Sequence, residues 1–536
     1  MKRILSIIPA RAGSKGIPNK NIRIVGGYPL IYYSINNARM SKYITDIVVT
    51  TDSPDIQTIA TQVDGVKCHI RDKKLCADDI TLDAVIYDAI PEGEWDYIVT
   101  MQPTSPTLRW ETLDAAIEKA MESGVDTLIS AVNRPHLSWR DSLDGLHKEP
   151  NYTTRLNRQY LPPEYFETGG FVISKYNVVT ENSRIGDTVD IFEVPSDEAI
   201  DVDTFEDLLC VETILRKEKI AIYVNGNNTR GLGHVYRALE LADEFYVKPD
   251  IFYDINQSER RVFGESTHNI IGVDGITQLF EICKKKQYTL FINDILNTSI
   301  DYMIGLRNVL PNAKVVNFED EGEGLIKADL VINALLSETD YPHVYAGEKY
   351  YIASKAFMFY KPIRVREKVK RVFICFGGAD PSNYADRLLA MISKEEYRNL
   401  EFVVALGKAK TNVSELMEYN SYENIDVMYD VKNMPEVMAS CDIAISSRGR
   451  TAYELAILGI PTIVVSENER EKTHAFASNE NGFTYIGMNP NDEIIESTLK
   501  MYIGLSQESR ERFHNILLSH DLRDGRKHIM GLINGI

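Results

Sequence analysis

Short apolar runs alternate with amphipathic stretches along the chain, and this pattern starts afresh at three places. The runs that begin at Ile4, Ile220 and Arg371 each predict a buried strand, and a glycine-containing loop and a helical pattern follow each of them. Strands that alternate with helices in this way form sheets with helices packed on their faces. The sequence therefore predicts an α/β fold made of three lobes.

Two charged stretches separate the lobes. One is LRKEK, at residues 215–219, and the other is KPIRVREKVK, at residues 361–370. They predict three domains, at 1–217, 218–365 and 366–536. The last two are of similar size, and two α/β lobes joined by a linker imply a cleft between them. Ligands bind where the carboxyl ends of strands face such a cleft.

Composition excludes several classes of function. The chain has 536 residues, with 59 Lys+Arg against 78 Asp+Glu, which gives a net charge of −19. A chain this acidic is not a general polyanion binder, so no nucleic acid partner is expected. Its six cysteines form no CxxC pair, which argues against a disulfide framework and for a reducing, cytoplasmic location. No apolar run approaches the ~20 residues of a membrane helix, so no membrane insertion is expected.

The loop after the first strand, in IIPARAGSKGIPNKN, carries the chemistry of an anion site. Arg11, Lys15 and Lys20 supply three cations, while Ser14 and Asn21 add hydrogen-bond donors. Two glycines between them let the backbone approach a ligand closely. The loop suits a triphosphate, although it has neither the Walker pattern nor GxGxxG. An ordinary basic surface loop is the alternative.

Two aspartates in the segment DVD form a candidate metal site. Asp201 and Asp203 are two residues apart, so in an extended chain both carboxylates point the same way and reach one hard cation such as Mg²⁺. The alternative is a solvated strand end that leads into the helix beginning at Thr204.

Seven motifs in a fixed order carry a family resemblance over roughly residues 1–215. They are IPARAGSKGIPNKN, GGYPLIYYSI, TTDSPDI, RDKKLCADD, QPTSPTLR, RLNRQYLP and DVDTFEDL. In these motifs the chain resembles the acylneuraminate cytidylyltransferases, the CMP-sialic acid synthetases. The resemblance implies a Rossmann-like nucleotidyltransferase domain that usually forms a homodimer. It also implies Mg²⁺-dependent transfer of CMP from CTP to the anomeric hydroxyl of a nonulosonic acid, with release of pyrophosphate.

The same resemblance assigns roles to residues. Lys20 and Asp203 are expected to be catalytic, and Gln102 is expected to face the sugar acid. Departures from the family pattern, at residues 71–75 and 168–169, lie near the nucleotide or the sugar and leave the identity of the sugar acid open. The remaining expected roles are nucleotide binding by Arg11, Ser14, Lys15, Asn21, Arg71 and Thr81, sugar-acid recognition near a subunit interface by Arg155 and Arg158, and metal binding by Asp201 and Asp203.

The second half carries another set of candidate residues. In GLGHVYR, His234 lies near a helix start, where the positive end of the helix dipole keeps an imidazole neutral and able to act on a sugar oxygen or water. The glycine turns in FGGADPSN and SSRGRTAYEL offer backbone amides for a pyrophosphate. Glu454 can bind ribose hydroxyls through its carboxylate. The alternatives are a structural histidine and a solvent-facing glutamate.

Together these motifs look like the UDP-sugar hydrolase of pseudaminic acid biosynthesis, a GT-B-like fold, over roughly residues 219–500. That resemblance implies catalysis by His234, pyrophosphate contacts at Gly378 and Thr451, ribose contact at Glu454 and sugar contact at Asn468. It implies removal of UDP from a 2,4-diacetamido-2,4,6-trideoxyhexose by water, without a metal. The Asn-Glu pair at 468–469 and the basic run at 447–450 depart from the pattern and leave this sugar open.

The combined hypothesis is a bifunctional enzyme of nonulosonic acid biosynthesis. Its substrates are CTP with a pseudaminic, legionaminic or N-acetylneuraminic acid at one site, and a UDP-sugar at the other. In one alternative the second half is a glycosyltransferase. In another it is a non-catalytic module that binds a nucleotide sugar beside an active cytidylyltransferase.

Overall fold

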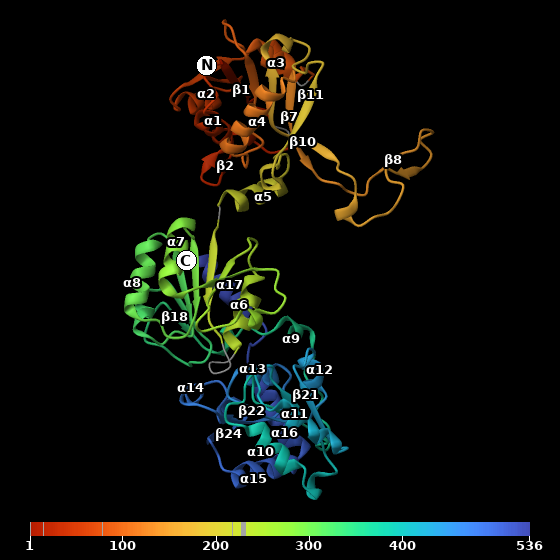
Figure 1. Ribbon diagram of the computed structural model, residues 1–536, viewed down its shortest axis with the longest axis vertical. Helices are drawn as coiled ribbons and strands as arrows, with labels where there is room; N and C mark the ends of the chain where they lie inside the picture. Colours follow the sequence, from red (N-terminus) through yellow and green to blue (C-terminus); the bar gives the residue numbers. More distant parts are fainter. Residues whose placement is uncertain (1, 14–15, 78, 217, 227–231) are drawn as a thin grey trace. The chain divides into compact units, whose positions relative to one another are not determined.

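The computed structural model describes residues 2–13, 16–77, 79–216, 218–226 and 232–536 (Figure 1). The chain divides into two compact units, Met1–Lys217 and Glu218–Ile536, hereafter unit 1 and unit 2. Among the described residues, no helix has the length and apolar character that a membrane span requires.

Unit 1 is built on a seven-stranded mixed sheet with the order β11-β7-β10-β6-β1-β4-β5. Parallel pairing joins β1 to β4 and β6, and β4 to β5, while β10 runs antiparallel to both β6 and β7. The strands are β1 (Ile4–Pro9), β4 (Asp46–Thr51), β5 (Val66–Ile70), β6 (Tyr97–Thr100), β7 (Thr127–Asn133), β10 (Tyr165–Lys175) and β11 (Val189–Glu193).

Helices cover both faces of this sheet. Alternate residues of β1 point to opposite faces, so Ile4 and Ile8 pack with Ile31 and Ile117 on one side, whereas Leu5 belongs to a smaller cluster on the other. The helices are α1 (Leu30–Met40), α2 (Pro54–Thr61), α3 (Leu82–Asp88), α4 (Trp110–Ser123) and α5 (Phe205–Leu215), and a short hairpin, β2 (Ile24–Val25) with β3 (Tyr28–Pro29), precedes α1.

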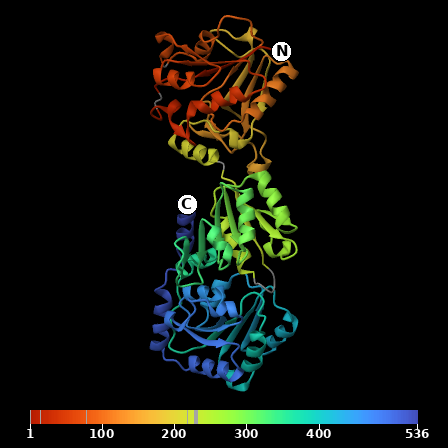
Figure 2. The ribbon, with the colours of Figure 1, turned by 90° about the vertical axis from the view of Figure 1, so that its left-hand side faces the viewer.

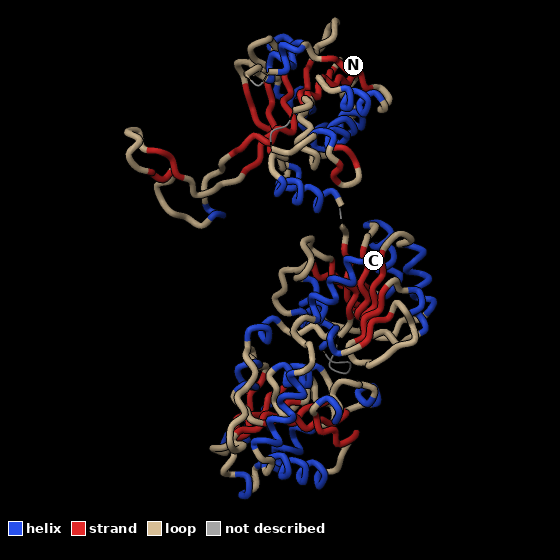
Figure 3. Tube along the Cα trace, turned by 180° about the vertical axis from the view of Figure 1, so that it is seen from behind, coloured by secondary structure: helices blue, strands red, loops and turns tan. Residues whose placement is uncertain are grey.

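An arm projects from unit 1 between β7 and β10, over residues 134–164 (Figure 3). It contains a small antiparallel hairpin, β8 (Trp139–Asp141) with β9 (Lys148–Pro150). Two leucines of the arm, Leu143 and Leu146, expose 107% and 85% of their surface. Since apolar side chains are rarely left this open, the arm has the character of an interaction surface.

Unit 2 contains two parallel sheets, one in each lobe (Figure 2). The first sheet has the order β14-β13-β12-β15-β16-β17-β18, and the second has the order β21-β20-β19-β22-β23-β24. Both are covered by helices, as parallel sheets require. The strands of the first lobe are β12 (Ile220–Val224), β13 (Asp250–Asp254), β14 (Asn269–Val273), β15 (Leu290–Asp294), β16 (Lys314–Phe318), β17 (Leu330–Asn333) and β18 (Val344–Ala346).

The second lobe follows the same plan. Its sheet consists of β19 (Arg371–Cys375), β20 (Glu401–Leu406), β21 (Ile425–Tyr429), β22 (Ile443–Ser447), β23 (Thr462–Ser466) and β24 (Phe483–Met488). The helices of unit 2 are α6 (Gly233–Ala242), α7 (Gly275–Lys286), α8 (Ile300–Val309), α9 (Lys355–Phe359), α10 (Tyr384–Ile392), α11 (Val413–Met417), α12 (Met434–Ala439), α13 (Arg450–Ile457), α14 (Glu469–Lys472), α15 (Asp492–Ile503), α16 (Gln507–Leu518) and α17 (Gly525–Gly535).

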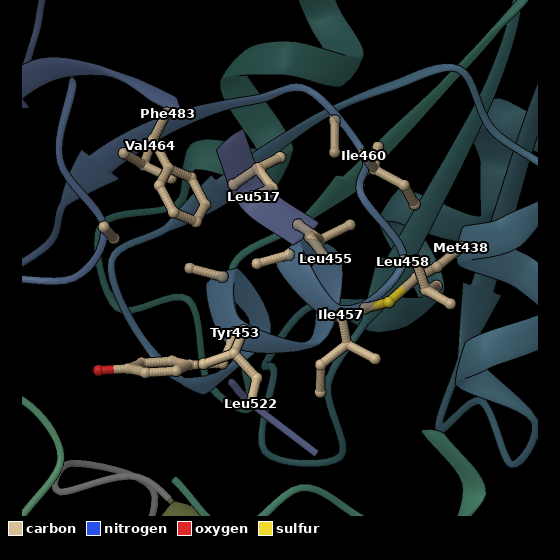
Figure 4. Packing of buried hydrophobic residues seen from close by; sticks show 14 of the residues in the cluster. Met438, Tyr453, Leu455, Ile457, Leu458, Ile460, Val464, Phe483, Leu517 and Leu522 are labelled. Atoms are coloured by element: carbon tan, nitrogen blue, oxygen red, sulfur yellow. The ribbon is translucent and has the colours of Figure 1, made fainter. Parts of the chain in front are cut away.

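Helix α13 is enclosed in the core of the second lobe. Figure 4 shows Leu455 of α13 among apolar side chains that include Val464 of β23 and Leu517 of α16. Its first turn is therefore held rigidly at the carboxyl end of β22.

The last helix returns to the first lobe, which the sequence did not predict. Ile529 and Ile533 of α17 pack in the same core cluster as Ile220 of β12. Arg526 donates to Glu244, two residues after α6, at 2.6 Å and to the carbonyl of Ala353 at 2.6 Å. The end of the chain thus joins the two lobes of unit 2, because α16 packs in the second lobe and α17 packs in the first.

Candidate active sites

A cavity of about 440 Å³ in unit 1 gathers half of the residues predicted for the first site. It lies where parallel strands end, because Arg11 follows β1, Arg71 follows β5 and Gln102 follows β6. The carboxyl ends of neighbouring parallel strands meet at one edge of a sheet, which brings distant parts of the sequence together. The predicted residues that line the cavity are Arg11, Lys20, Asn21, Arg71, Gln102 and Asp203.

Lys20 joins the N-terminal loop to the acidic segment. Its Nζ lies 3.1 Å from Oδ1 of Asp203 and donates to the carbonyl of Val202 at 2.9 Å. The loop approaches so closely that a Cβ placed on Gly16 would lie 2.8 Å from the carbonyl oxygen of Asp203. Lys20 and Asp203 therefore face the same cavity, as their predicted roles require.

Arg71 brings a buried guanidinium to the cavity. The residue is only 7% exposed, and its Nη2 donates to the carbonyl of Thr50 at 3.1 Å. Its Nε is buried and has no hydrogen-bond partner among the described residues. Burial, with a smaller contribution from the nearby charge of Arg11, lowers the pKa of Arg71, although Asp52 opposes this shift. A guanidinium with an open hydrogen-bonding position suits a phosphate oxygen.

Asp201 and Asp203 are the two carboxylates that would hold Mg²⁺ in unit 1. Burial is the largest cause that raises the pKa of Asp201, and the charge of Asp203 adds to it, while a hydrogen bond from Thr104 opposes it. A divalent cation would relieve the repulsion between the two carboxylates. Among the described residues no cluster of three His, Cys, Asp or Glu could hold a metal ion. The pair therefore fits Mg²⁺ only if phosphate oxygens complete its coordination, which is the usual mode for this ion.

Other predicted residues of unit 1 lie elsewhere. The hydroxyl of Thr81 caps α3 and accepts from the amide of Ala84 at 3.4 Å, one residue before the cavity wall at Leu82. Arg155 and Arg158 are on the arm and do not line the cavity. Arg155 donates to the hydroxyl of Tyr152 at 3.1 Å. Ser14 and Lys15 lie outside the described residues.

Sequence reasoning missed the apolar wall of this cavity. Leu75, Cys76, Ile80, Leu82 and Val85 line it together with the polar residues. Leu75 and Cys76 lie in the motif RDKKLCADD, Ile80 lies just before α3, and Leu82 and Val85 lie within it. The apolar residues of this motif and of the start of α3 are the signal that could have indicated this wall.

His234 is the centre of the candidate site in unit 2. It is 9% exposed, and it lies in the first turn of α6, as predicted. Its Nδ1 is 2.5 Å from Oδ1 of Asp294, which is the last residue of β15. The shorter contact, to the carboxylate, favours a proton on Nδ1 and leaves Nε2 as the basic nitrogen, while Nη2 of Arg237 also lies 3.0 Å from Nδ1.

Two further charged residues surround this pair, and the sequence did not indicate them. Arg237 donates through Nε to Oδ2 of Asp294 at 2.8 Å and through Nη2 to Oδ1 at 2.6 Å. It also forms an ion pair with Glu319, just after β16. Burial is the largest single cause and would raise the pKa values of Asp294 and Glu319, but the charge and hydrogen bonds of Arg237, together with His234, outweigh it and lower both.

The predicted pyrophosphate residues lie at neighbouring strand ends of the second lobe. Gly378 follows β19, and its carbonyl accepts from the amide of Ala409 at 2.9 Å. The preceding Gly377 has a φ of 65°, which a glycine adopts without strain. Thr451 is in the first turn of α13, after β22. Gly378 lies in a turn and Thr451 lies at a helix N-terminus, and backbone amides at such positions can bind an anion.

Glu454 and Asn468 differ in how available their side chains are. Burial raises the pKa of Glu454 to about 7, although Arg450 opposes this shift. The side-chain oxygen of Asn468 accepts from the amide of Glu471 at 3.0 Å and so caps α14. Beside it, burial and the charge of Glu471 raise the pKa of Glu467 to about 9, so Glu467 is the neutral side chain at the end of β23.

Comparison with known proteins defines the class of each part. A family model described as cytidylyltransferase matches residues 5–223, and one described as the C-terminal domain of glycosyltransferase family 28 matches residues 372–481. An uncharacterized protein of Methanocaldococcus jannaschii is 28% identical over 47% of this chain and 57% of its own length. N-acylneuraminate cytidylyltransferase A of Danio rerio is 31% identical over 38% of this chain and 48% of its own. This chain thus spans about half the length of these two relatives.

A shorter relative is covered almost completely. Pseudaminic acid cytidylyltransferase of Campylobacter jejuni is 30% identical over 38% of this chain and 92% of its own length. The chain belongs, through its N-terminal part, to the cytidylyltransferase family. Its fold class is α/β: a Rossmann-like nucleotidyltransferase domain precedes a two-lobed, GT-B-like module, part of which is similar to the C-terminal domain of glycosyltransferase family 28.

Proposed function

We propose that unit 1 transfers CMP from CTP to the anomeric hydroxyl of a sialic-acid-like sugar and releases pyrophosphate. The observation that carries this proposal is the single cavity in which Arg11, Lys20 and Arg71 face Asp203. The names of the relatives, which include acylneuraminate and pseudaminic acid cytidylyltransferases, support the same substrate class. Pseudaminic, legionaminic and N-acetylneuraminic acids are the candidate acceptors.

In this reaction the anomeric oxygen bonds to the α-phosphorus of CTP while the bond from that phosphorus to pyrophosphate breaks. The hydroxyl proton passes to solvent water, and negative charge develops on the leaving pyrophosphate. Arg11, Lys20 and Arg71 stabilise this charge by position, without a covalent intermediate. Asp201 and Asp203 would hold Mg²⁺, which neutralises phosphate charge when it is bound.

Asp203→Asn tests this proposal. It keeps the shape of the side chain but removes the charge that faces Lys20, and we expect pyrophosphate release from CTP to fall roughly a hundredfold. Asp187→Asn, at an exposed position of unit 1, is the matched control. A panel of nonulosonic acids, with products identified by mass spectrometry, gives the acceptor. Unchanged turnover by Asp203→Asn contradicts the assignment.

We infer that unit 1 forms a homodimer through the arm. Leu143 and Leu146 expose their apolar surface at its tip, and Arg155 and Arg158 lie further along it, outside the cavity of their own chain. Replacement of Leu143 by Asp is expected to convert the dimer to a monomer in light scattering. A wild-type chain that is monomeric at micromolar concentration would exclude this arrangement.

For unit 2 we propose hydrolysis of a UDP-2,4-diacetamido-2,4,6-trideoxyhexose to UDP and the free sugar. The buried pair of His234 and Asp294 carries this proposal, because it provides a base at Nε2. Water oxygen bonds to the anomeric carbon, the bond from that carbon to UDP breaks, and the water proton passes to His234. In such a pathway the free sugar precedes the acid that unit 1 activates.

A glycosyltransferase is the second candidate for unit 2, because the matching family model describes a glycosyltransferase domain. A module that only binds a nucleotide sugar is the third. UDP release in water alone supports the hydrolase, whereas release only with a sugar acceptor supports the transferase. If unit 2 is either enzyme, His234→Ala should abolish turnover and retain UDP binding. If unit 2 is only a binding module, the wild type and His234→Ala should both bind UDP without turnover.

A further inference from the structure

The buried charges around His234 form a continuous chain of contacts between the two lobes of unit 2. The first link is the pair of His234 and Asp294, and the second is the two-point contact of Arg237 with the Asp294 carboxylate, at 2.8 and 2.6 Å. The ion pair of Arg237 with Glu319 is the third. All four residues are at least nine-tenths buried. In such surroundings each charge depends on its partner, so a displacement of one is felt by the next.

Glu319 is the member of this chain that meets the second lobe. Its carbonyl oxygen accepts from Nη2 of Arg470 at 2.8 Å, and Arg470 belongs to α14. Its backbone has a φ of 50°, an unusual conformation for a residue with a side chain, which persists only where surrounding contacts hold it. The contacts of Glu319 with Arg237 and Arg470 are of this kind.

The segment around α14 is firmly docked on the first lobe. The amide of Ala475 donates to the carbonyl of Leu335 at 2.7 Å. The hydroxyl of Tyr453, on α13, donates to the carbonyl of the adjacent Ala334 at 2.9 Å. Asn468 caps α14, so the end of β23 is joined directly to the short helix that carries Arg470.

We propose that Glu319 is a positioning residue that couples docking of the second lobe, through Arg470, to the orientation of His234. When Arg470 holds the Glu319 main chain, the Glu319 carboxylate fixes Arg237, and Arg237 holds Asp294 against Nδ1 of the imidazole. When the lobes separate, this support is lost and the histidine is no longer fixed in one tautomer. His234 is therefore oriented as a base only when the second lobe is docked on the first, which protects a bound substrate from untimely reaction. The role of His234 as base rests on the proposed function of unit 2.

The experiment uses the full chain with ¹⁵N-labelled histidine, in which the resonances of His234 among the ten histidines are assigned by His234→Gln. Arg470→Met removes the donor to the Glu319 main chain and keeps an apolar stem. Glu319→Gln removes the charge that pairs with Arg237. Lys472→Met on the same helix and Glu321→Gln two residues away are the matched controls.

We expect both test variants to move the His234 resonances toward a mixture of tautomers and to lower kcat for the UDP-sugar at least tenfold. UDP affinity, measured by calorimetry, should stay within twofold of wild type, and both controls should match wild type. Unchanged His234 resonances in Arg470→Met overturn the proposal, even if its activity falls. If Glu319→Gln does not fold, Arg470→Met decides alone.

The resonances also separate this proposal from the proposed function. If the wild type turns over no UDP-sugar, the function of unit 2 is wrong, and the tautomer of His234 still tests the coupling. If turnover is present and the resonances do not respond, the coupling is wrong and the hydrolase or transferase stands.

Discussion

At the scale of single residues, Gly16 sets how closely the N-terminal loop approaches the acidic segment. A methyl group there would lie 2.8 Å from the main-chain oxygen of Asp203, which cannot move aside as a side chain would. We therefore expect Gly16→Ala to lift the loop and weaken CTP binding roughly tenfold, about 1.4 kcal/mol. Isothermal titration with CTP measures this effect.

The control lies three residues away in the same loop. A Cβ on Gly13 would meet no atom of the described residues within 4 Å, so Gly13→Ala changes the same residue type without a contact to them. CTP affinity of Gly13→Ala should stay within twofold of wild type. Equal losses in the two variants would mean that loop flexibility, not the contact with Asp203, governs binding.

Glu454 gives unit 2 a pH-dependent stability. Its pKa is raised by burial to about 7 in the folded chain, above its ordinary value of 4.5. The folded state therefore keeps a proton that the unfolded chain releases, so stability falls as pH rises from about 4.5 to about 7. Glu454→Gln cannot ionise, and its melting temperature relative to wild type should be higher at pH 8 than at pH 5. The same difference at both pH values would contradict a raised pKa.

The residues that the sequence predicted together are those whose chemistry is written in one short segment. Arg11 and Lys20 share a loop, and the two aspartates are two residues apart, so a local pattern was enough to predict a site there. Asp294 and Glu319 were missed because each is a lone acid at the end of a different strand. Their meaning arises only when β15 and β16 place them beside α6.

At the scale of elements, the apolar runs predicted the strands well because a buried parallel strand needs an almost continuous apolar segment. The expected starts at Ile4, Ile220 and Arg371 are the first residues of β1, β12 and β19. The return of α17 to the first lobe could not be predicted, because an amphipathic helix carries no mark of which lobe its apolar face will cover.

The packing of α17 leads to a prediction for the first lobe of unit 2. Ile529 is fully buried against the core that includes β12, so Ile529→Ala should destabilise unit 2 by about 2–5 kcal/mol. Lys527→Ala, at an exposed position of the same helix, is the control. Chemical denaturation measures both, and cytidylyl transfer by unit 1 should be unaffected. If Ile529→Ala loses no more free energy of unfolding than Lys527→Ala, α17 contributes little to the core.

At the scale of the whole molecule, two units carry separate cores. Each hydrophobic cluster of the described residues takes its members from unit 1 alone or from unit 2 alone. Units with independent cores unfold as separate cooperative transitions. The division of the chain is therefore a thermodynamic property as well as a geometric one, and calorimetry of the intact protein can resolve it.

Each transition should respond to its own ligand. A ligand at 100 times its Kd stabilises the unit that binds it by about 2.7 kcal/mol. This raises the midpoint temperature of unfolding by roughly 5 to 10 °C for unit 1, and by less for the larger unit 2. We expect CTP with Mg²⁺ to shift only the transition of unit 1, and UDP to shift only that of unit 2. Arg71→Met should remove the first shift and leave the second. If either nucleotide moves both transitions, the two sites are coupled and the molecule works as one allosteric body.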